Sequence, residues 1–184
     1  MAQAPASQTA NRPLEAEALR LLTVIHQLGE PSSDGSRRLV GESTLLQLDH
    51  LVRHPPLLAH LLIHLYDTDD SWIERRLAVS RQVRQLLSLD ASRSAAPRPK
   101  GLPESHLDFP PQARWRRLDD ALALASSRGL LEVGVSDGAP RPELHYEVTP
   151  AGADLLENRV FTDGPETPRH LEICGVIREF LPQW

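Results

Sequence analysis

Four histidines are the residues whose type and spacing could do chemistry in this sequence. His50 and His54 are four positions apart in one predicted helix, and His60 and His64 repeat the spacing in the next. Residues at i and i+4 share a helical face, and imidazole is a common zinc ligand. Asp49 could orient one ring as an outer carboxylate. No HExxH motif accompanies these histidines. We interpret them as histidines at a helix interface or in solvent, and we predict no metal site.

Other candidate reactive groups are few. The neighbouring carboxylates Asp69-Asp70 and Asp119-Asp120 would point about 100° apart on a helix, which suits capping and solvation better than acid/base catalysis. The single cysteine, Cys174, lies in the apolar run LEICGVI, which predicts a buried, unreactive thiol. The motifs GxxxxGK[ST], GxSxG and GxGxxG do not occur. We therefore predict a protein that is not an enzyme and that uses no cofactor.

Composition places the chain among compact globular proteins. It has 184 residues, of which 40% are hydrophobic, enough for one domain or two small ones. No apolar run is long enough to cross a bilayer, and the segment MAQAPASQTANRP lacks the apolar region of a signal peptide. One cysteine and no CxxC pair fit a reducing compartment. We expect a cytoplasmic protein without membrane contact.

The formal net charge of −5 conceals an uneven distribution. Residues 71–100 carry seven basic and two acidic side chains, whereas the segments on both sides carry an excess of acid. A basic middle could contact nucleic acid or an acidic partner, and it could equally pair with acidic parts of its own chain. The cations of this segment that lie in a predicted helix are Arg75, Arg76, Arg81 and Arg84.

Helical periodicity dominates the first half of the chain. Apolar stripes predict helices over 13–28, 42–54, 55–66 and 71–89, with Pro13 and Pro55-Pro56 at helix starts and Gly29 at a helix end. The stretch EPSSDGSRR between the first two is predicted as a loop. We divide the chain into a disordered tail (1–12), a helical N-terminal region (13–88), a linker or long loop (89–109), a hairpin module (110–158) and a C-terminal amphipathic helix (159–184).

The hairpin module has its own pattern. PPQARWRRLDDALALASSRG predicts a helix that ends at Gly129, and LLEVGV and LHYEVT alternate like two strands of a hairpin. In TPAGADLLENRV, Thr149 suits the N-cap and Pro150 the first position of another helix. The predicted fold is mainly α, with a helical N-terminal half and one β-hairpin.

The succession helix, RGLLE, strand, loop, YEVTPAG and helix over residues 110–158 resembles the C-terminal half of a winged helix-turn-helix domain, as in MarR-like and PadR-like regulators. The resemblance implies a winged-helix fold in which the helix before the hairpin reads DNA. Its exposed face would carry Arg116 beside Asp119 and Asp120, which can neutralise that cation at i,i+3 and i,i+4. Because phosphate contacts need uncompensated cations, we expect this module to meet protein before DNA. The acidic residues of the predicted hairpin are Glu132, Asp137, Glu143 and Glu147, against Arg141 alone.

A second resemblance covers the whole chain. RLLTVIHQLGE, then TLLQLDHLVRHPPLLAHLL, then a linker and a winged helix are similar to the middle component of prokaryotic ABC-three-component systems. Those proteins are partners of an SMC-like or ABC-type ATPase with a separate effector, often in anti-phage defence. The resemblance implies an adaptor subunit without catalytic residues, which could meet DNA through the complex. The residues predicted to bind a partner are Trp115, Arg116, Asp119, Asp120, Arg141, Phe180 and Trp184.

Two further readings stay open. The chain could be a DNA-binding transcriptional regulator, with phosphates contacted by Arg114, Arg116, Arg117 and Arg141 and the basic middle segment assisting. The terminal stretch PRHLEICGVIREFLPQW has apolar residues at helical spacing, and it could pack on its own core or dock a partner or a second copy.

Overall fold

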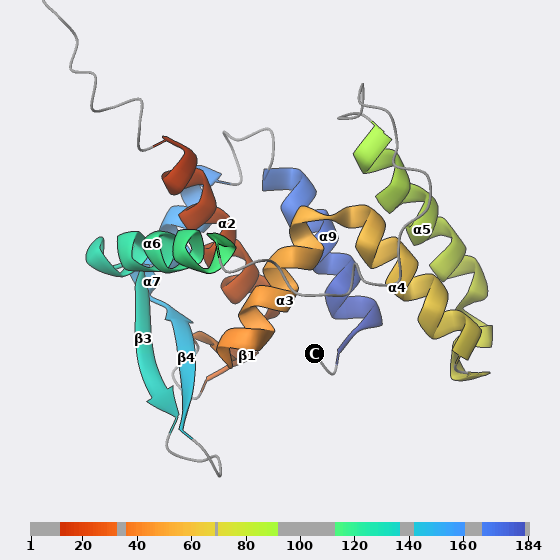
Figure 1. Ribbon diagram of the computed structural model, residues 1–184, viewed down its shortest axis with the longest axis horizontal. Helices are drawn as coiled ribbons and strands as arrows, with labels where there is room; N and C mark the ends of the chain where they lie inside the picture. Colours follow the sequence, from red (N-terminus) through yellow and green to blue (C-terminus); the bar gives the residue numbers. More distant parts are fainter. Residues whose placement is uncertain are drawn as a thin grey trace, which may run out of the picture.

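Figure 1 shows the computed structural model of the protein. The structure describes residues 12–32, 36–68, 70–91, 113–136, 142–160 and 167–182. Nearly all of the predicted tail (1–12) and of the predicted linker (89–109) lies outside these ranges, as do Asp69, Asp137, Arg141 and Trp184.

The fold is mainly α, as the sequence predicts. The predicted helices form close to their expected bounds, except that the fourth begins with a 3-10 segment before its α-helical part. The helical elements are α2 (Arg12–Leu28), α3 (Glu42–Arg53), α4 (Pro55–Thr68), the 3-10 helix η1 (Asp70–Arg75), α5 (Arg76–Ala91), α6 (Ala113–Ser127), α7 (Pro150–Leu155), the π-helical turn η3 (Leu156–Val160) and α9 (Thr167–Phe180).

A small antiparallel sheet joins distant parts of the chain. Its strands are β1 (Glu30–Pro31), β2 (Arg37–Val40), β3 (Leu131–Ser136) and β4 (Glu143–Val148), in the order β1-β2-β4-β3. The predicted hairpin is confirmed as β3 and β4. The prediction of a loop for EPSSDGSRR is wrong, because part of this stretch forms β1 and the start of β2. Strand β2 pairs with β4, with Leu39 opposite Tyr146.

Helix α2 lies at the centre of the molecule, against α6, α9, α3 and β2 (Figure 1). Its predicted apolar stripe forms the core, with Leu21, Leu22 and Ile25 at most 1% exposed. The same holds for Leu45 and Leu48 of α3. The N-terminal helices and the hairpin therefore share one hydrophobic core and one sheet.

Helices α4 and α5 pack against each other at the end of the molecule away from the hairpin (Figure 1). Val79 and Leu86 bury the inner side of α5, and α9 also contacts this helix. Among the helices that the structure describes, none combines the length and the apolarity needed to cross a membrane.

Candidate functional site

The hairpin is positioned by the way in which α6 ends. Gly129 has φ +68°, a left-handed conformation that glycine adopts without steric cost. The amide of Leu130 donates to the carbonyl of Ala125 at 3.0 Å, and the amide of Gly129 donates to that of Ser126 at 2.9 Å. This pair of hydrogen bonds is a Schellman motif, and it turns the chain from α6 directly into β3.

Thr149 closes the other end of the hairpin against the same turn. Its Oγ1 accepts from the amide of Gly152 at 3.1 Å, which confirms the predicted N-cap of α7, and donates to the carbonyl of Gly129 at 2.7 Å. A Cβ placed on Gly152 would lie 2.3 Å from the carbonyl oxygen of Leu130. Residues 129–130 and 149–152 thus fix the hairpin to α6 through backbone contacts and through the hydroxyl of Thr149.

One face of the hairpin starts in the core and continues into solvent. Cross-strand pairs place Leu131 with Val148, Val133 with Tyr146 and Val135 with Leu144 on the same side of the sheet. Leu131, Tyr146 and Val148 are buried, whereas Val133, Val135 and Leu144 are 45%, 54% and 40% exposed. The apolar side of the hairpin therefore extends beyond the helices that cover its base.

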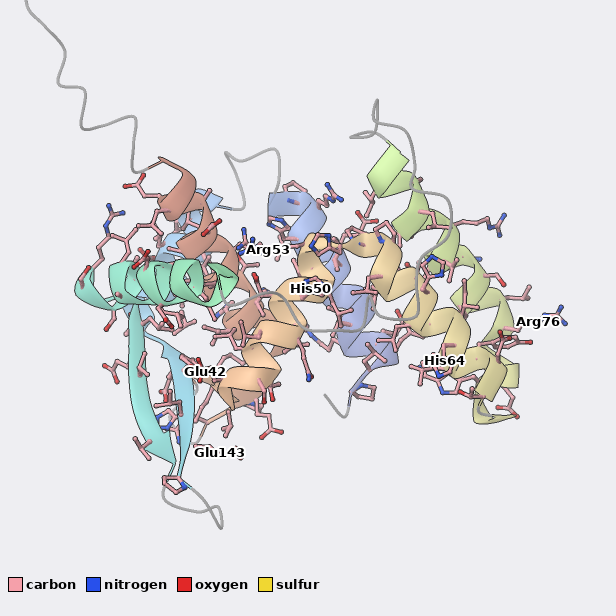
Figure 2. All side chains as sticks on the ribbon, viewed as in Figure 1. Glu42, His50, Arg53, His64, Arg76 and Glu143 are labelled. Carbon is pink, nitrogen blue, oxygen red and sulfur yellow. The ribbon has the colours of Figure 1, made fainter. Side chains whose placement is uncertain are left out.

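Two carboxylates lie near the covered part of this face, and a third, Glu143, is on the opposite side of the sheet. Burial, followed by the charges of Glu42 at the start of α3 and Asp119 in α6, raises the pKa of Tyr146 to about 12. The carboxylate of Glu143 comes within 4.0 Å of the position of a Cβ on Gly41, next to Glu42 (Figure 2). We call this surface the hairpin face, and its members are Glu42, Asp119, Val133, Val135, Leu144 and Tyr146.

The opposite side of the sheet carries an ion pair beside the exposed Val40. Arg38 donates from Nε and Nη2 to Oε2 of Glu147, at 3.0 and 2.8 Å, and Ser36 also donates to this carboxylate. The negative charge of Glu147, one of the acidic residues of the predicted hairpin, is therefore matched by Arg38. Glu132 is exposed on the same side, opposite Glu147.

The predicted partner residues are only partly brought together. Asp119 and Asp120 are exposed in α6. Trp115 and the arginines Arg114, Arg116 and Arg117 lie in the first turns of α6, but their side chains are outside the described part of the structure.

The structure places Phe180 inside the molecule, whereas it is among the residues predicted from the sequence to contact a partner. It is 2% exposed, stacks on Trp72 with ring centroids 6.0 Å apart, and has the guanidinium of Arg75 5.1 Å from its ring centroid. Helix α9 thus packs its apolar face into the chain's own core, which also contains Cys174. Burial raises the pKa of the Cys174 thiol to about 12, so that the thiolate is a minor species at neutral pH.

The predicted cations of α5 lie far from the hairpin face. Arg76, Arg81 and Arg84 are exposed, and none of them has an ion-pair partner among the residues that the structure describes. Arg76 is at the outer edge of the molecule in Figure 2. Arg75 instead turns toward α9, where its Nη2 donates to the carbonyl of Glu179 at 3.4 Å.

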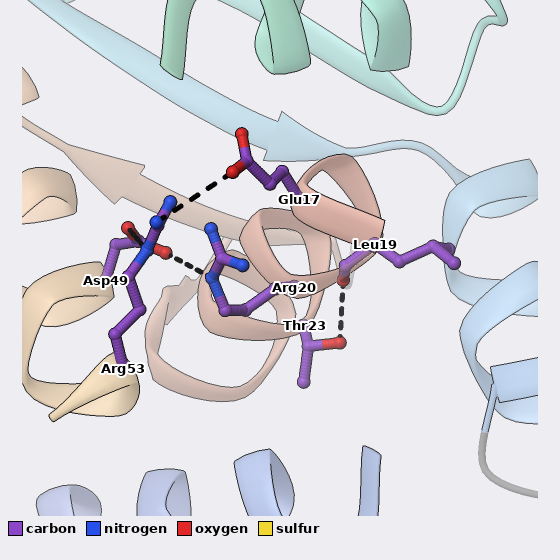
Figure 3. A network of polar contacts seen from close by, with 6 residues as sticks. All are labelled: Glu17, Leu19, Arg20, Thr23, Asp49 and Arg53. Atoms are coloured by element: carbon purple, nitrogen blue, oxygen red, sulfur yellow. Dashed lines mark hydrogen bonds and ion pairs between the residues drawn. The ribbon is translucent and has the colours of Figure 1, made fainter. Parts of the chain in front are cut away.

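A buried polar network joins α2 to α3 (Figure 3). The Oδ1 of Asp49 accepts from Nε of Arg20 and the Oδ2 accepts from Nε of Arg53, both at 2.7 Å, and Arg53 lies 3.9 Å from Glu17. Desolvation by burial lowers the pKa of Arg53, an effect that the charge of Asp49 opposes. Asp49 is 5% exposed. Two arginines therefore bind the buried carboxylate that the sequence suggested as an outer partner of a zinc-binding histidine.

The histidine pairs do not converge on one point. The rings of His50 and His54 lie 4.6 Å apart at the end of α3, and His60 and His64 are exposed on α4. Within the described ranges, no group of three or more His, Cys, Asp or Glu side chains is placed to hold a metal ion.

Comparisons with protein-family models, with curated proteins and with solved structures find no match for this chain.

Proposed function

We propose that this chain is a non-enzymatic winged-helix adaptor subunit of a multi-protein complex, and that it meets a protein partner through the hairpin face. Helices α2, α3 and α6 with the sheet would be the winged helix, and α4 and α5 an insertion between α3 and α6. The support for this assignment is the order of the elements and the joint between α6, the hairpin and α7.

One observation carries the proposal, namely the chemical character of the hairpin face. Val133, Val135 and Leu144 form an exposed apolar strip, and the carboxylates of Glu42 and Asp119 act on Tyr146 at its covered end. An apolar centre with a charged rim is what protein interfaces bury. A DNA backbone instead requires cations, and carboxylates here would repel its phosphates.

The more specific form of the proposal places the chain between an SMC-like or ABC-type ATPase and an effector in prokaryotic anti-phage defence, in the cytoplasm. Its support is the sequence resemblance of residues 20–62, together with the single buried cysteine for the location. The competing function is a DNA-binding regulator, which draws its support from the arginines of α6 and from the cations of α5.

The experiment is a cross-linked purification of the tagged chain from cells that express it naturally, with identification of the recovered proteins. The variant V135D/L144D places two charges in the exposed apolar strip, and E132Q is the matched control on the opposite side of β3. We expect wild type and E132Q to recover the same partner and V135D/L144D to lose it. An ATPase of the SMC or ABC type among the lost proteins would support the specific form. Equal recovery by all three proteins would refute a role for the hairpin face.

A further inference from the structure

The outer side of α5 is a second unpartnered surface with its own chemistry. Leu77 is 83% exposed, the most exposed large hydrophobic residue described, and Leu87 is 42% exposed. Arg81 and Arg84 follow Leu77 by about one and two helical turns, so that they share its side of the helix. Val79 and Leu86 occupy the buried side. We call the surface of Leu77, Arg81, Arg84 and Leu87 the α5 outer face.

Within the described residues, no ion pair neutralises the arginines of this face, although Gln85 of the same helix donates to the carboxylate of Glu172 in α9. The sequence from 76 to 89 contains no Asp or Glu. Arg81 and Arg84 have no ion-pair partner among the described residues, and Nε of Arg84 donates only to the backbone carbonyl of Ser80, at 3.2 Å. Both cations are exposed on the same side of the helix as Leu77.

The hairpin face has the complementary composition. It offers three exposed apolar side chains and the carboxylates of Glu42 and Asp119, while the α5 outer face offers two leucines and two arginines. The two faces lie at opposite ends of the molecule (Figure 1), so that they cannot cover each other within one copy. One copy can nevertheless cover the α5 outer face of another with its hairpin face.

We propose that the protein associates head to tail, with the α5 outer face of one copy docked on the hairpin face of the next. The occupant of each face is thus a second copy of this chain. Contacts of this kind join two different surfaces. Each assembly therefore keeps a free hairpin face at one end and a free α5 outer face at the other, so that it grows into chains or closes into a ring. Opposite charges steer the faces together, and added salt weakens that attraction.

This inference stands apart from the proposed function, although both use the hairpin face. A partner with a basic and apolar helix would compete with the α5 outer face for the same strip. If the protein recovers a partner but stays monomeric, the proposed function is unaffected and only the proposal of self-association is refuted.

The test is sedimentation velocity of purified full-length protein over a wide concentration range, at low and at high salt. We expect the mean mass of wild type to rise past that of a dimer with concentration, and to fall toward that of a monomer in salt. The variant L77D/R84E alters the α5 outer face, V135D/L144D alters the hairpin face, and I63D places a charge on the exposed apolar Ile63 of α4 as a control. Circular dichroism and thermal unfolding confirm that each variant folds.

The decisive step is mixing. L77D/R84E retains an intact hairpin face and V135D/L144D retains an intact α5 outer face, so each should be monomeric alone. Together they should form a 1:1 dimer and nothing larger, while I63D should assemble like wild type. The proposal is overturned by monomeric wild type, by variants that still assemble alone, or by a mixture that stays monomeric. Binding of duplex DNA or anionic vesicles through Arg84 by a monomeric protein would also overturn it.

Discussion

The hairpin end and the α5 end of the molecule both present exposed apolar side chains, but they are held in different ways. The hairpin buries Leu131, Tyr146 and Val148, and backbone geometry adds the left-handed Gly129, the close approach at Gly152 and the hydrogen bonds of Thr149. Helix α5 is held by apolar packing of Val79 and Leu86 and by the stack of Trp72 on Phe180.

The charge of the two ends differs as well. The carboxylates of Glu42 and Asp119 act on Tyr146 at the covered end of the hairpin strip, and Arg81 and Arg84 share the side of α5 that exposes Leu77. The hairpin strip continues a face of the core, whereas the exposed leucines of α5 lie away from its buried residues. Helices α2 and α3 contact the hairpin directly and reach α5 through α4 and α9, so that they are a common support for both ends.

Breaking that common support should have the largest effect. In D49A, the guanidinium groups of Arg20 and Arg53 would stay buried without their carboxylate, and loss of one partner of a buried ion pair costs about 3–5 kcal/mol. We expect the free energy of unfolding to fall by about that amount in urea denaturation. Because α2 and α3 contact the hairpin and reach α5 through α4 and α9, tryptophan and tyrosine fluorescence should report a single shared transition. A loss below about 1 kcal/mol would mean that the network does not hold the helices together.

The backbone joint can be broken at the hairpin end alone. In G152A, the new Cβ would meet the carbonyl oxygen of Leu130, and overpacking of this kind costs about 1–3 kcal/mol. The matched control is G175A in α9, where a Cβ meets nothing within 4 Å. Removal of a mid-helix glycine should raise stability by about 0.5–1 kcal/mol. Chemical denaturation of the two variants should therefore shift in opposite directions, and equal shifts would contradict the role given to Gly152.

The acidic character of the hairpin face can be read from Tyr146. Its folded pKa of about 12 exceeds the ordinary value near 10. As the pH rises, the unfolded state releases this proton before the folded state does. The contribution of protonated Tyr146 to the free energy of unfolding is therefore complete below about pH 10 and is lost as the pH rises toward 12. D119N and E42Q should each lower this pKa slightly, because each removes a charge that disfavours the phenolate. Ultraviolet titration in a Y66F background measures the pKa of Tyr146. An unchanged pKa in both variants would show that these carboxylates do not act on Tyr146.

The sequence predicts those parts of the fold that have a local signal. The helical stripes, the glycine end of α6, the alternating strands and the N-cap at Thr149 all depend on residues within a few positions of one another. Strand β2 does not, because RRLV is short and its partner in β4 lies more than a hundred residues away along the chain. Strand β1 pairs with β2 close by in the sequence, but two residues are too few to show an alternating pattern.

The candidate site was predicted less completely than the fold. Alternation in LLEVGV and LHYEVT identifies one apolar side of the hairpin but not the point at which its cover ends, between Tyr146 and Leu144. Glu42 was missed as a site residue, because it comes from α3 and meets the hairpin only in the folded chain. The burial of Phe180 could not be predicted, because an amphipathic terminal helix has the same pattern whether its apolar face covers its own core or a partner.

The most direct way to decide whether the hairpin face meets protein rather than DNA is a titration of short duplex DNA with the purified protein at several salt concentrations. Fluorescence anisotropy would follow the binding of wild type and of R116A/R141A. We expect binding that is weak for wild type and unchanged in this variant. Tight binding with a steep salt dependence that R116A/R141A abolishes would contradict this expectation.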